Sequence, residues 1–110
     1  MIYTSYFAGY KGDRGISIAR KTPKWFNGNE LMEFAPSWSL INIKDNQEEY
    51  TRRYHEEVLK NITNNLLMGL KDGDVLLCWE SPDKFCHRHI VAEWLIERGI
   101  EAKELTKGKR

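Results

Sequence analysis

Long apolar runs, cysteines and prolines are scarce in this sequence, and each scarcity excludes a class of protein. No apolar run approaches the roughly 20 residues that a membrane helix requires, so we expect no membrane contact. Two cysteines and three prolines among 110 residues exclude a scaffold held together by many disulfides and a proline-rich low-complexity chain. The N-terminal residues lack a basic region followed by a long apolar one, and we therefore expect a cytoplasmic protein.

Net charge is also nearly absent. The formal charge of +1 gives no overall field that would attract nucleic acid, but the charges are unevenly distributed. Acids gather in residues 45–57, bases predominate in residues 11–24, and the end is basic again, with Lys103, Lys107, Lys109 and Arg110. The segment 11–24 could face an anionic ligand, or it could be an ordinary solvated surface.

Apolar side chains are present in sufficient number for one core. Hydrophobic residues make up 41% of the chain and aromatic residues 12%, including four tryptophans. A chain of 110 residues cannot bury enough apolar surface for a second core, and it contains no internal repeat and no dividing linker. We therefore expect a single domain over residues 1–110.

The N-terminal half predicts two strands and a less regular stretch. Residues 2–7 are rich in β-branched and aromatic side chains, and residues 16–19 alternate after Gly15, so both predict strands. Residues 21–30 contain proline and glycine and predict an exposed loop. Residues 31–43 are ambiguous, because a helical turn could open at Pro36 whereas residues 38–43 also suit a strand.

The C-terminal half predicts a helix, a buried strand, a second helix and a returning strand. Apolar residues recur at four-residue spacing over 47–70, which predicts a long amphipathic helix capped by Asp45 or Asn46. The continuous apolar run 75–79 predicts the central strand of a parallel sheet. A second helix is expected over about residues 85–98, ended by Gly99, and residues 100–105 can return as a parallel strand. The fold class predicted is α/β, a Rossmann-like, small, mostly parallel sheet flanked by helices.

Chemically capable side chains gather where the central strand leads into the second helix. Ligands of open α/β sheets bind beyond the carboxyl ends of the strands, at helix N-termini. Cys78 and Glu80 leave the strand on the same side, and Cys86, His87 and Arg88 stand at the helix start. Arg88 would suit a phosphate or carboxylate; its alternative role is to pair with Glu80.

Each candidate catalytic residue has a structural alternative. Cys86, beside His87 and Arg88, has the electropositive surroundings of a nucleophilic thiolate, but free cysteine is also a common buried residue. Glu80 could act as a general base, as a nucleophile at a sugar carbon or as an acceptor for ribose hydroxyls, or it could only anchor a neighbour. A polar network that merely holds the turn would resemble an active site in sequence.

The two cysteines are expected to be a reduced pair, with a transient disulfide as the alternative. Thiolates and imidazoles suit zinc, but His87 and His89 are two residues apart on a helix and diverge. We therefore assign no metal site from the sequence. His55, on the acidic helix, is expected at the surface or as a satisfied core residue. No motif identifies a cofactor.

Several stretches together carry a family resemblance. The most specific joins residues 76–80 (LLCWE) to residues 85–95 (FCHRHIVAEWL), with Pro82 between them. Supporting matches upstream are residues 16–21 (ISIARK), 23–26 (PKWF) and 35–38 (APSW), and the helix around Tyr50 and Tyr54. Over nearly its whole length the chain resembles the domain-of-unknown-function 488 family.

The resemblance implies a Rossmann-like fold and no particular activity. The site that it implies consists of Cys78, Glu80, Cys86, His87 and Arg88, with Arg20 and Lys21 facing it. In our first hypothesis Arg88 and the helix amides, assisted by Arg20 or Lys21, hold a nucleotide-like or otherwise phosphorylated molecule, and Cys78 belongs to the same ligand site. In the catalytic version of that hypothesis the chemistry is carried by Glu80, Cys86 and His87.

Two competing functions remain on sequence grounds. A binding module would sequester such a ligand and release it intact. A nucleic-acid-associated protein would contact phosphates through residues 11–24 and the basic end of the chain, with Trp25 or Phe26 stacking on bases. The near-zero net charge and the acidic segment 45–57 argue against the nucleic-acid hypothesis.

Overall fold

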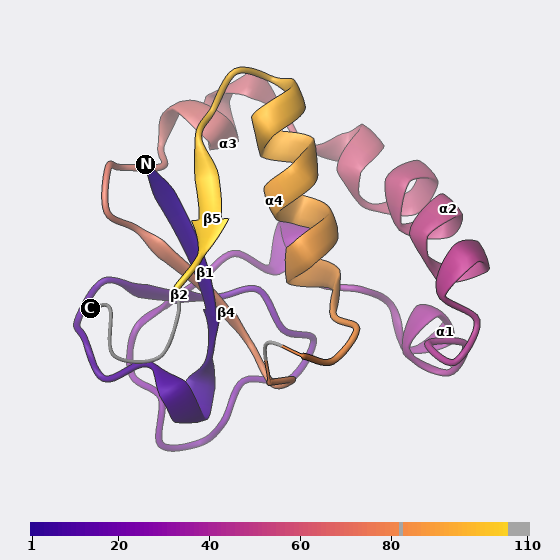
Figure 1. The fold of residues 1–110 in the computed structure, drawn as a ribbon, viewed down its shortest axis with the longest axis horizontal. Helices are drawn as coiled ribbons and strands as arrows, with labels where there is room; N and C mark the ends of the chain where they lie inside the picture. The colour runs from indigo at the N-terminus through magenta and orange to yellow at the C-terminus, as the bar shows by residue number, and fades with distance from the viewer. Residues whose placement is uncertain (82, 106–110) are drawn as a thin grey trace.

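The computed structural model describes residues 1–81 and 83–105 (Figure 1). Its strands are β1 (Ile2–Tyr6), β2 (Gly15–Ser17), β3 (Asn29–Glu30), β4 (Val75–Cys78) and β5 (Ala102–Glu104). Its α-helices are α1 (Trp38–Ile41), α2 (Gln47–Glu57), α3 (Asn64–Met68) and α4 (His87–Glu97). Short 3-10 turns occur at Phe7–Gly9, Met32–Phe34 and Leu59–Asn61.

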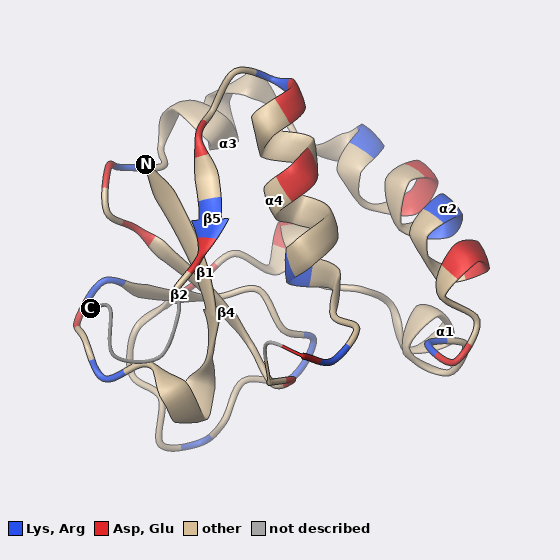
Figure 2. Cartoon of the chain, in the orientation of Figure 1, with Lys and Arg blue, Asp and Glu red and all other residues tan. Residues whose placement is uncertain are grey.

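The five strands form one parallel sheet in the order β3-β2-β4-β1-β5. The predicted central strand is confirmed, since β4 lies in the middle and all four of its residues are buried. The returning strand β5 is parallel, as predicted, but pairs with β1 and not with β4. The architecture is Rossmann-like α/β, and β1, β2 and β4 carry no charged residue (Figure 2).

Two hydrophobic clusters cover the two faces of the sheet. Leu76 of β4 belongs to the larger cluster, together with side chains from α1, α2 and α4, so the helices gather over this face. Val75 and Leu77 alternate onto the opposite face, where they pack with Phe7, Ala19 and partly buried aromatic residues of the segment 7–28. Side chains of the segment 7–28 therefore cover the face on which the described residues place no α-helix.

The predicted continuous helix over residues 47–70 is wrong. The structure breaks it into α2, the turn Leu59–Asn61 and α3. The Asn61 side-chain amide donates to the Glu57 carbonyl (2.9 Å), and the Thr63 hydroxyl accepts from the Leu66 amide (3.2 Å), which starts α3. These side chains form hydrogen bonds with backbone groups, and those hydrogen bonds compete with the hydrogen bonds of a continuous helix. Ile62 and Leu66 still pack against the core, so the apolar stripe survives without a continuous helix.

The ambiguous segment 31–43 forms a turn and a short helix. Ser37 caps α1, because its hydroxyl accepts a hydrogen bond from the Leu40 amide (3.1 Å). The cap predicted for α2 is confirmed at Asn46, whose side-chain oxygen accepts from the Glu49 amide (3.2 Å). The predicted loop 21–30 ends in the two-residue strand β3.

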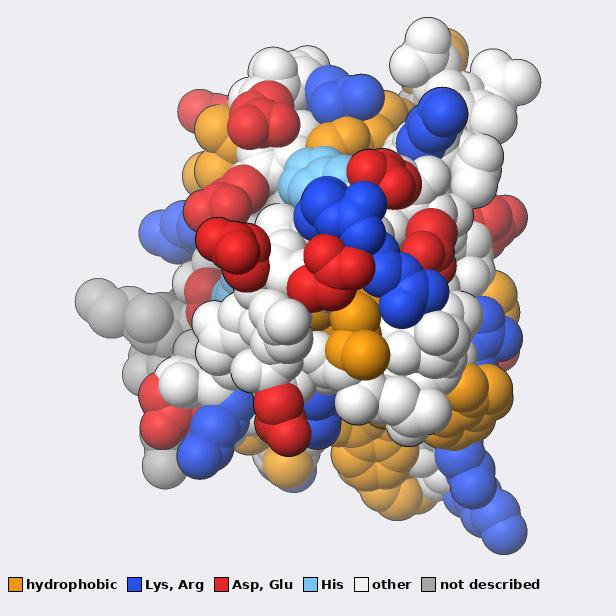
Figure 3. Space-filling view, turned by 90° about the vertical axis from the view of Figure 1, so that its right-hand side faces the viewer, with side chains coloured by type: hydrophobic (Ala, Val, Ile, Leu, Met, Phe, Trp, Pro, Cys, Tyr) orange, Lys and Arg blue, Asp and Glu red, His pale blue; other side chains and the backbone are white. Residues whose placement is uncertain are grey.

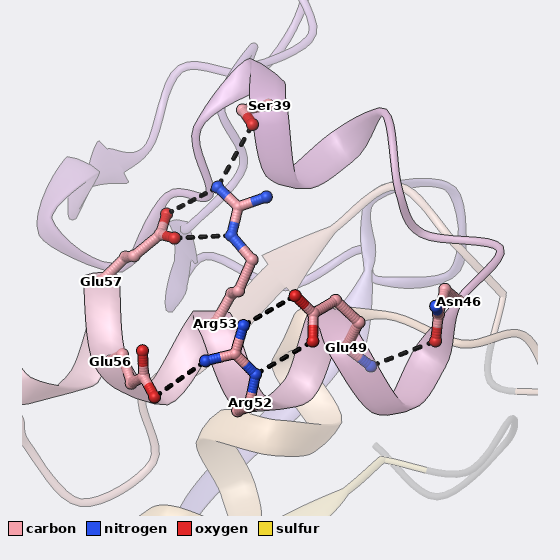
Figure 4. A network of polar contacts seen from close by, with 7 residues as sticks. All are labelled: Ser39, Asn46, Glu49, Arg52, Arg53, Glu56 and Glu57. Carbon is pink, nitrogen blue, oxygen red and sulfur yellow. Dashed lines mark hydrogen bonds and ion pairs between the residues drawn. The ribbon is translucent and has the colours of Figure 1, made fainter.

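Charges on the exposed side of α2 largely neutralise one another. Arg52 binds both Glu49 and Glu56, and Arg53 binds Glu57 and the Ser39 hydroxyl of α1 (Figure 4). The space-filling view of this side shows acidic and basic side chains interspersed (Figure 3). Exposed ion pairs of this kind add little stability. The main effects of the network are that neither positive nor negative charge dominates this face and that α1 is connected to α2.

No helix in the described part of the chain is long and apolar enough to cross a membrane.

Helix α4 ends in a turn that delivers β5 to the sheet. Gly99 has φ of +83°, its amide donates to the Ile96 carbonyl (3.0 Å), and the Ile100 amide donates to the Leu95 carbonyl (3.0 Å). This is a Schellman motif, and it requires a residue that tolerates the left-handed conformation.

Replacing Gly99 should therefore destabilise the fold through the backbone alone, because a Cβ placed there meets no atom within 4 Å. We expect Gly99→Ala to lower the free energy of unfolding by about 1 kcal/mol, measured by urea denaturation. Gly99→Asn should cost less, because asparagine tolerates the left-handed region better. Equal stability of wild type and Gly99→Ala would contradict this account.

Candidate functional site

A cavity opens beyond the carboxyl ends of the neighbouring strands β2 and β4. The chain continues from β2 into residues 19–21 and from β4 through residues 78–80. Because the two strands pair in parallel, these two segments lie at the same edge of the sheet. The cavity measures about 370 Å³. It is lined by Ala19, Arg20, Lys21, Pro36, Trp38, Ile41, Lys44, Tyr50, Cys78, Trp79, Glu80, Phe85, Cys86 and His87.

Three cations surround the outer part of this cavity: Arg20, Lys21 and Lys44, which we call the cationic rim. Arg20 is held by a hydrogen bond from Nε to the Pro36 carbonyl (2.9 Å). The Lys44 ammonium lies 3.7 Å from a carboxylate oxygen of Glu80. Within residues 1–81 and 83–105, Glu80 is the only carboxylate that lines the cavity with these three cations, so the rim is electropositive as a whole.

Aromatic side chains form much of the remaining wall. Trp79 is fixed by a hydrogen bond from its indole nitrogen to the Lys21 carbonyl (2.7 Å), although 51% of the residue is exposed. Tyr50 is buried and meets Phe85 edge-on, with ring centroids 5.1 Å apart. Trp38 is 59% exposed at the start of α1. Flat apolar surface thus lies next to the cationic rim.

Cys78, Cys86 and His87 are buried residues of the lining, and their ligand atoms all lie within 4.8 Å of one another. The structure joins Cys78 and Cys86 in a disulfide, whereas the sequence favoured a reduced pair with the disulfide as the alternative. Cys86 is also the N-cap residue of α4, where its side chain makes no capping hydrogen bond.

His87 is oriented by one hydrogen bond. Its Nε2 lies 2.7 Å from the Ile18 carbonyl oxygen, which can only accept, so Nε2 carries the hydrogen and donates it. The unprotonated Nδ1 then faces the Cys86 sulfur at 3.7 Å. Burial lowers the pKa of His87 to about 4, although the hydrogen bond to Ile18 acts in the opposite direction. The imidazole is therefore neutral at physiological pH.

Arg88 is completely buried, and each of its three guanidinium nitrogens has a hydrogen-bond partner. Its guanidinium donates to both carboxylate oxygens of Glu104 (3.0 and 2.9 Å), to the Cys78 sulfur (2.9 Å) and to the backbone carbonyl of Glu80 (2.7 Å). The carboxylate that Arg88 pairs with is thus that of Glu104, on β5, while the Glu80 carboxylate turns toward Lys44.

The structure brings six of the seven sequence-selected site residues to the cavity, and the seventh, Arg88, lies behind Cys78. Sequence reasoning missed Lys44 and the aromatic wall, because Trp38, Lys44 and Tyr50 come from a distant part of the chain with no local signal. It also missed Glu104, whose only signal is a charged side chain in a short strand. His89 lies apart, with Nδ1 4.0 Å from a Glu104 oxygen, and His55 is exposed on α2.

The residues assigned to nucleic-acid contact are dispersed. Trp25 is 64% exposed, but Phe26 folds back onto Phe7 with ring centroids 5.4 Å apart. Arg14 pairs with Asp74 (3.1 Å), so it is not a free cation. The basic residues Lys107, Lys109 and Arg110 lie outside the described residues.

Comparison with protein families identifies the chain. A family model described as the active DUF488-N3 subclade, DUF488-N3a, matches residues 11–99. The chain belongs to the DUF488 family. The match in this DUF488 chain spans every residue that lines the cavity, while β1 and β5 fall outside it. No curated protein and no solved structure matches the DUF488 chain.

Breaking the pair between Arg88 and Glu104 should be costly, because Glu104→Gln leaves a buried guanidinium without its counter-charge. We expect Glu104→Gln to lower the free energy of unfolding by about 3 kcal/mol, measured by urea denaturation. Glu101→Gln is the matched control, since Glu101 is exposed in the same part of the chain, and it should change stability by less than about 0.5 kcal/mol. Similar effects of the two substitutions would show that the buried pair does not stabilise the fold.

Proposed function

We propose that this DUF488 protein binds a nucleotide-like, phosphorylated small molecule in the cavity at the ends of β2 and β4. The observation that carries the proposal is that the cationic rim and an aromatic wall share one cavity. The position of the cavity also supports the proposal, because ligands of open parallel sheets bind beyond the carboxyl ends of the strands. The volume of about 370 Å³ lies within the usual range for small-molecule sites.

The phosphate would be held by the cationic rim. Arg20 is the best oriented of the three cations, because its Nε is fixed on the Pro36 carbonyl and the remaining guanidinium nitrogens stay available for a bidentate contact. Lys21 and Lys44 would add point charges on either side. In this proposal Arg88 does not contact the ligand. Its hydrogen bonds to the Cys78 sulfur and the Glu80 carbonyl hold two residues that line the cavity.

The flat part of the ligand would lie against the aromatic wall. Trp38 and Trp79 are exposed enough to stack on a base, and Tyr50 and Phe85 close the inner apolar surface. Glu80, which lines the same cavity, is an acceptor suited to ribose hydroxyls. A ligand with a planar ring, a polyhydroxylated sugar and a phosphate thus finds a matching partner for each part.

A catalytic version of this proposal rests on the contact between His87 and Cys86. In the reduced protein, the Nδ1 lone pair of His87 can accept the thiol proton of Cys86 and leave a thiolate beside the bound ligand. Glu80 is the other candidate nucleophile or general base. Recovery of a bound ligand unchanged would favour simple binding, whereas Glu80→Gln or Cys86→Ser should abolish turnover if a reaction occurs.

The binding proposal can be tested with adenosine 5′-monophosphate as the probe. Quenching of tryptophan fluorescence should report binding, because Trp38 and Trp79 line the cavity. We expect the double variant Lys21→Ala, Lys44→Ala to bind the monophosphate at least tenfold more weakly, about 1.4 kcal/mol, since two phosphate contacts are lost. Adenosine, which lacks the phosphate, should bind the wild type weakly and be insensitive to the same substitutions.

Two controls make this experiment decisive. Lys60→Ala removes an exposed lysine that does not line the cavity and should leave binding unchanged. Native mass spectrometry of freshly purified protein should show an adduct of nucleotide size that is absent from the double variant. Equal affinity for adenosine and its monophosphate would remove the phosphate role, and no binding of either, with no adduct, would overturn the proposal.

A further inference from the structure

Three buried side chains at the cavity offer a set of ligands that soft metal ions prefer. The Cys78 sulfur, the Cys86 sulfur and a ring nitrogen of His87 all lie within 4.8 Å of one another. Two thiolates and an imidazole are ligands typical of zinc. All three residues also line the cavity, so the cluster is reachable from solvent.

His87 has the orientation of a metal ligand. Metal-bound histidines almost always donate their second ring N–H to a carboxylate or carbonyl, which fixes the tautomer and the ring plane. Here Nε2 donates to the Ile18 carbonyl (2.7 Å), and the lone pair of Nδ1 points toward Cys86. Tetrahedral zinc with ordinary bond lengths separates a bound nitrogen from a bound sulfur by about 3.6 Å. The observed Nδ1 to Sγ distance is 3.7 Å.

The surroundings of Cys78 suit a thiolate. Arg88 donates a hydrogen bond to the Cys78 sulfur (2.9 Å), as the outer partners of metal-bound thiolates do. Glu104 neutralises the guanidinium charge, so Arg88 and Glu104 together add no net charge next to an ion. Two thiolates would in turn balance a divalent cation, and the buried cluster would be electrically neutral when loaded.

The backbone separation of the two cysteines also suits a shared ion. Their Cα atoms are 7.5 Å apart, whereas disulfides usually join Cα atoms about 4.4–6.8 Å apart. Sulfurs bound to one tetrahedral zinc ion lie about 3.8 Å apart. The two cysteines can place their sulfurs at this distance without a shortening of the Cα separation. The sequence argument against a metal considered His87 together with His89, and the structure instead groups His87 with both cysteines.

We propose that the reduced protein binds one zinc ion through Cys78 Sγ, Cys86 Sγ and His87 Nδ1, with the fourth coordination position open to the cavity. Three protein ligands and one open position are the arrangement of catalytic and not of structural zinc sites. Binding displaces the two thiol protons. The disulfide form offers no thiolate, so it cannot hold the ion.

The experiment uses the full chain with Zn²⁺ or Co²⁺ alone. Native mass spectrometry of the protein reduced under nitrogen should show one zinc ion per chain. The cobalt-loaded protein should show sulfur-to-cobalt charge-transfer absorption. The same chain with its cysteines oxidised, verified by the absence of titratable thiols, should bind neither ion, and this comparison needs no substitution.

Substitutions distinguish the proposed zinc ligands from neighbouring residues that do not bind the ion. Cys86→Ser and His87→Gln should each weaken zinc binding at least tenfold, and Cys86→Ser should also reduce the charge-transfer absorption. His89→Gln changes the imidazole two residues along the same helix and should leave zinc affinity unchanged. The folded state of each variant is checked by circular dichroism before titration.

Failure of the reduced, folded wild type to take up zinc would overturn the proposal. Unchanged affinity in Cys86→Ser, or equal binding by the oxidised and reduced proteins, would also overturn it. None of these results bears on nucleotide binding by the cationic rim, because Lys21 and Lys44 are not zinc ligands. The two proposals can therefore fail separately.

Discussion

The buried guanidinium of Arg88 is the interaction on which the site depends. It stands on α4 and binds the last residue of β4, the backbone just beyond it and Glu104 on β5. One side chain thus connects the strand, helix and strand that surround the turn. A charge of this kind is tolerated inside the protein only because its counter-charge and its hydrogen-bond partners are in place.

Local patterns were sufficient for much of the fold. The apolar run at β4, the glycine after α4 and the cap at Asn46 each act within a few residues, so they predict elements directly. The long helix failed because Asn61 and Thr63 supply competing hydrogen bonds inside an otherwise regular stripe. The periodicity of apolar residues shows which face is buried. It does not show whether the backbone stays helical between the buried positions.

The candidate site was predictable where chemistry follows one strand into one helix, and unpredictable elsewhere. Cys78, Glu80, Cys86 and His87 come from a single turn and meet in space as expected. Lys44 reaches the cavity only through the path between α1 and α2, and Glu104 only through the pairing of β5 with β1. Such contacts depend on tertiary packing, which no short window of sequence contains.

The sheet face on which the described residues place no α-helix is covered by packed aromatic side chains, and this limits the changes that the chain tolerates. Phe7, at the heart of that cover, meets the rings of Trp25, Phe26 and Trp79. Trp79 also lines the cavity, so the aromatic cover of this face is in direct contact with the candidate site. Insertions, which surface loops usually absorb freely, would here pull on a packed aromatic layer. An insertion in the segment 7–28 would therefore disturb the packing of Phe7 as well as the loop itself.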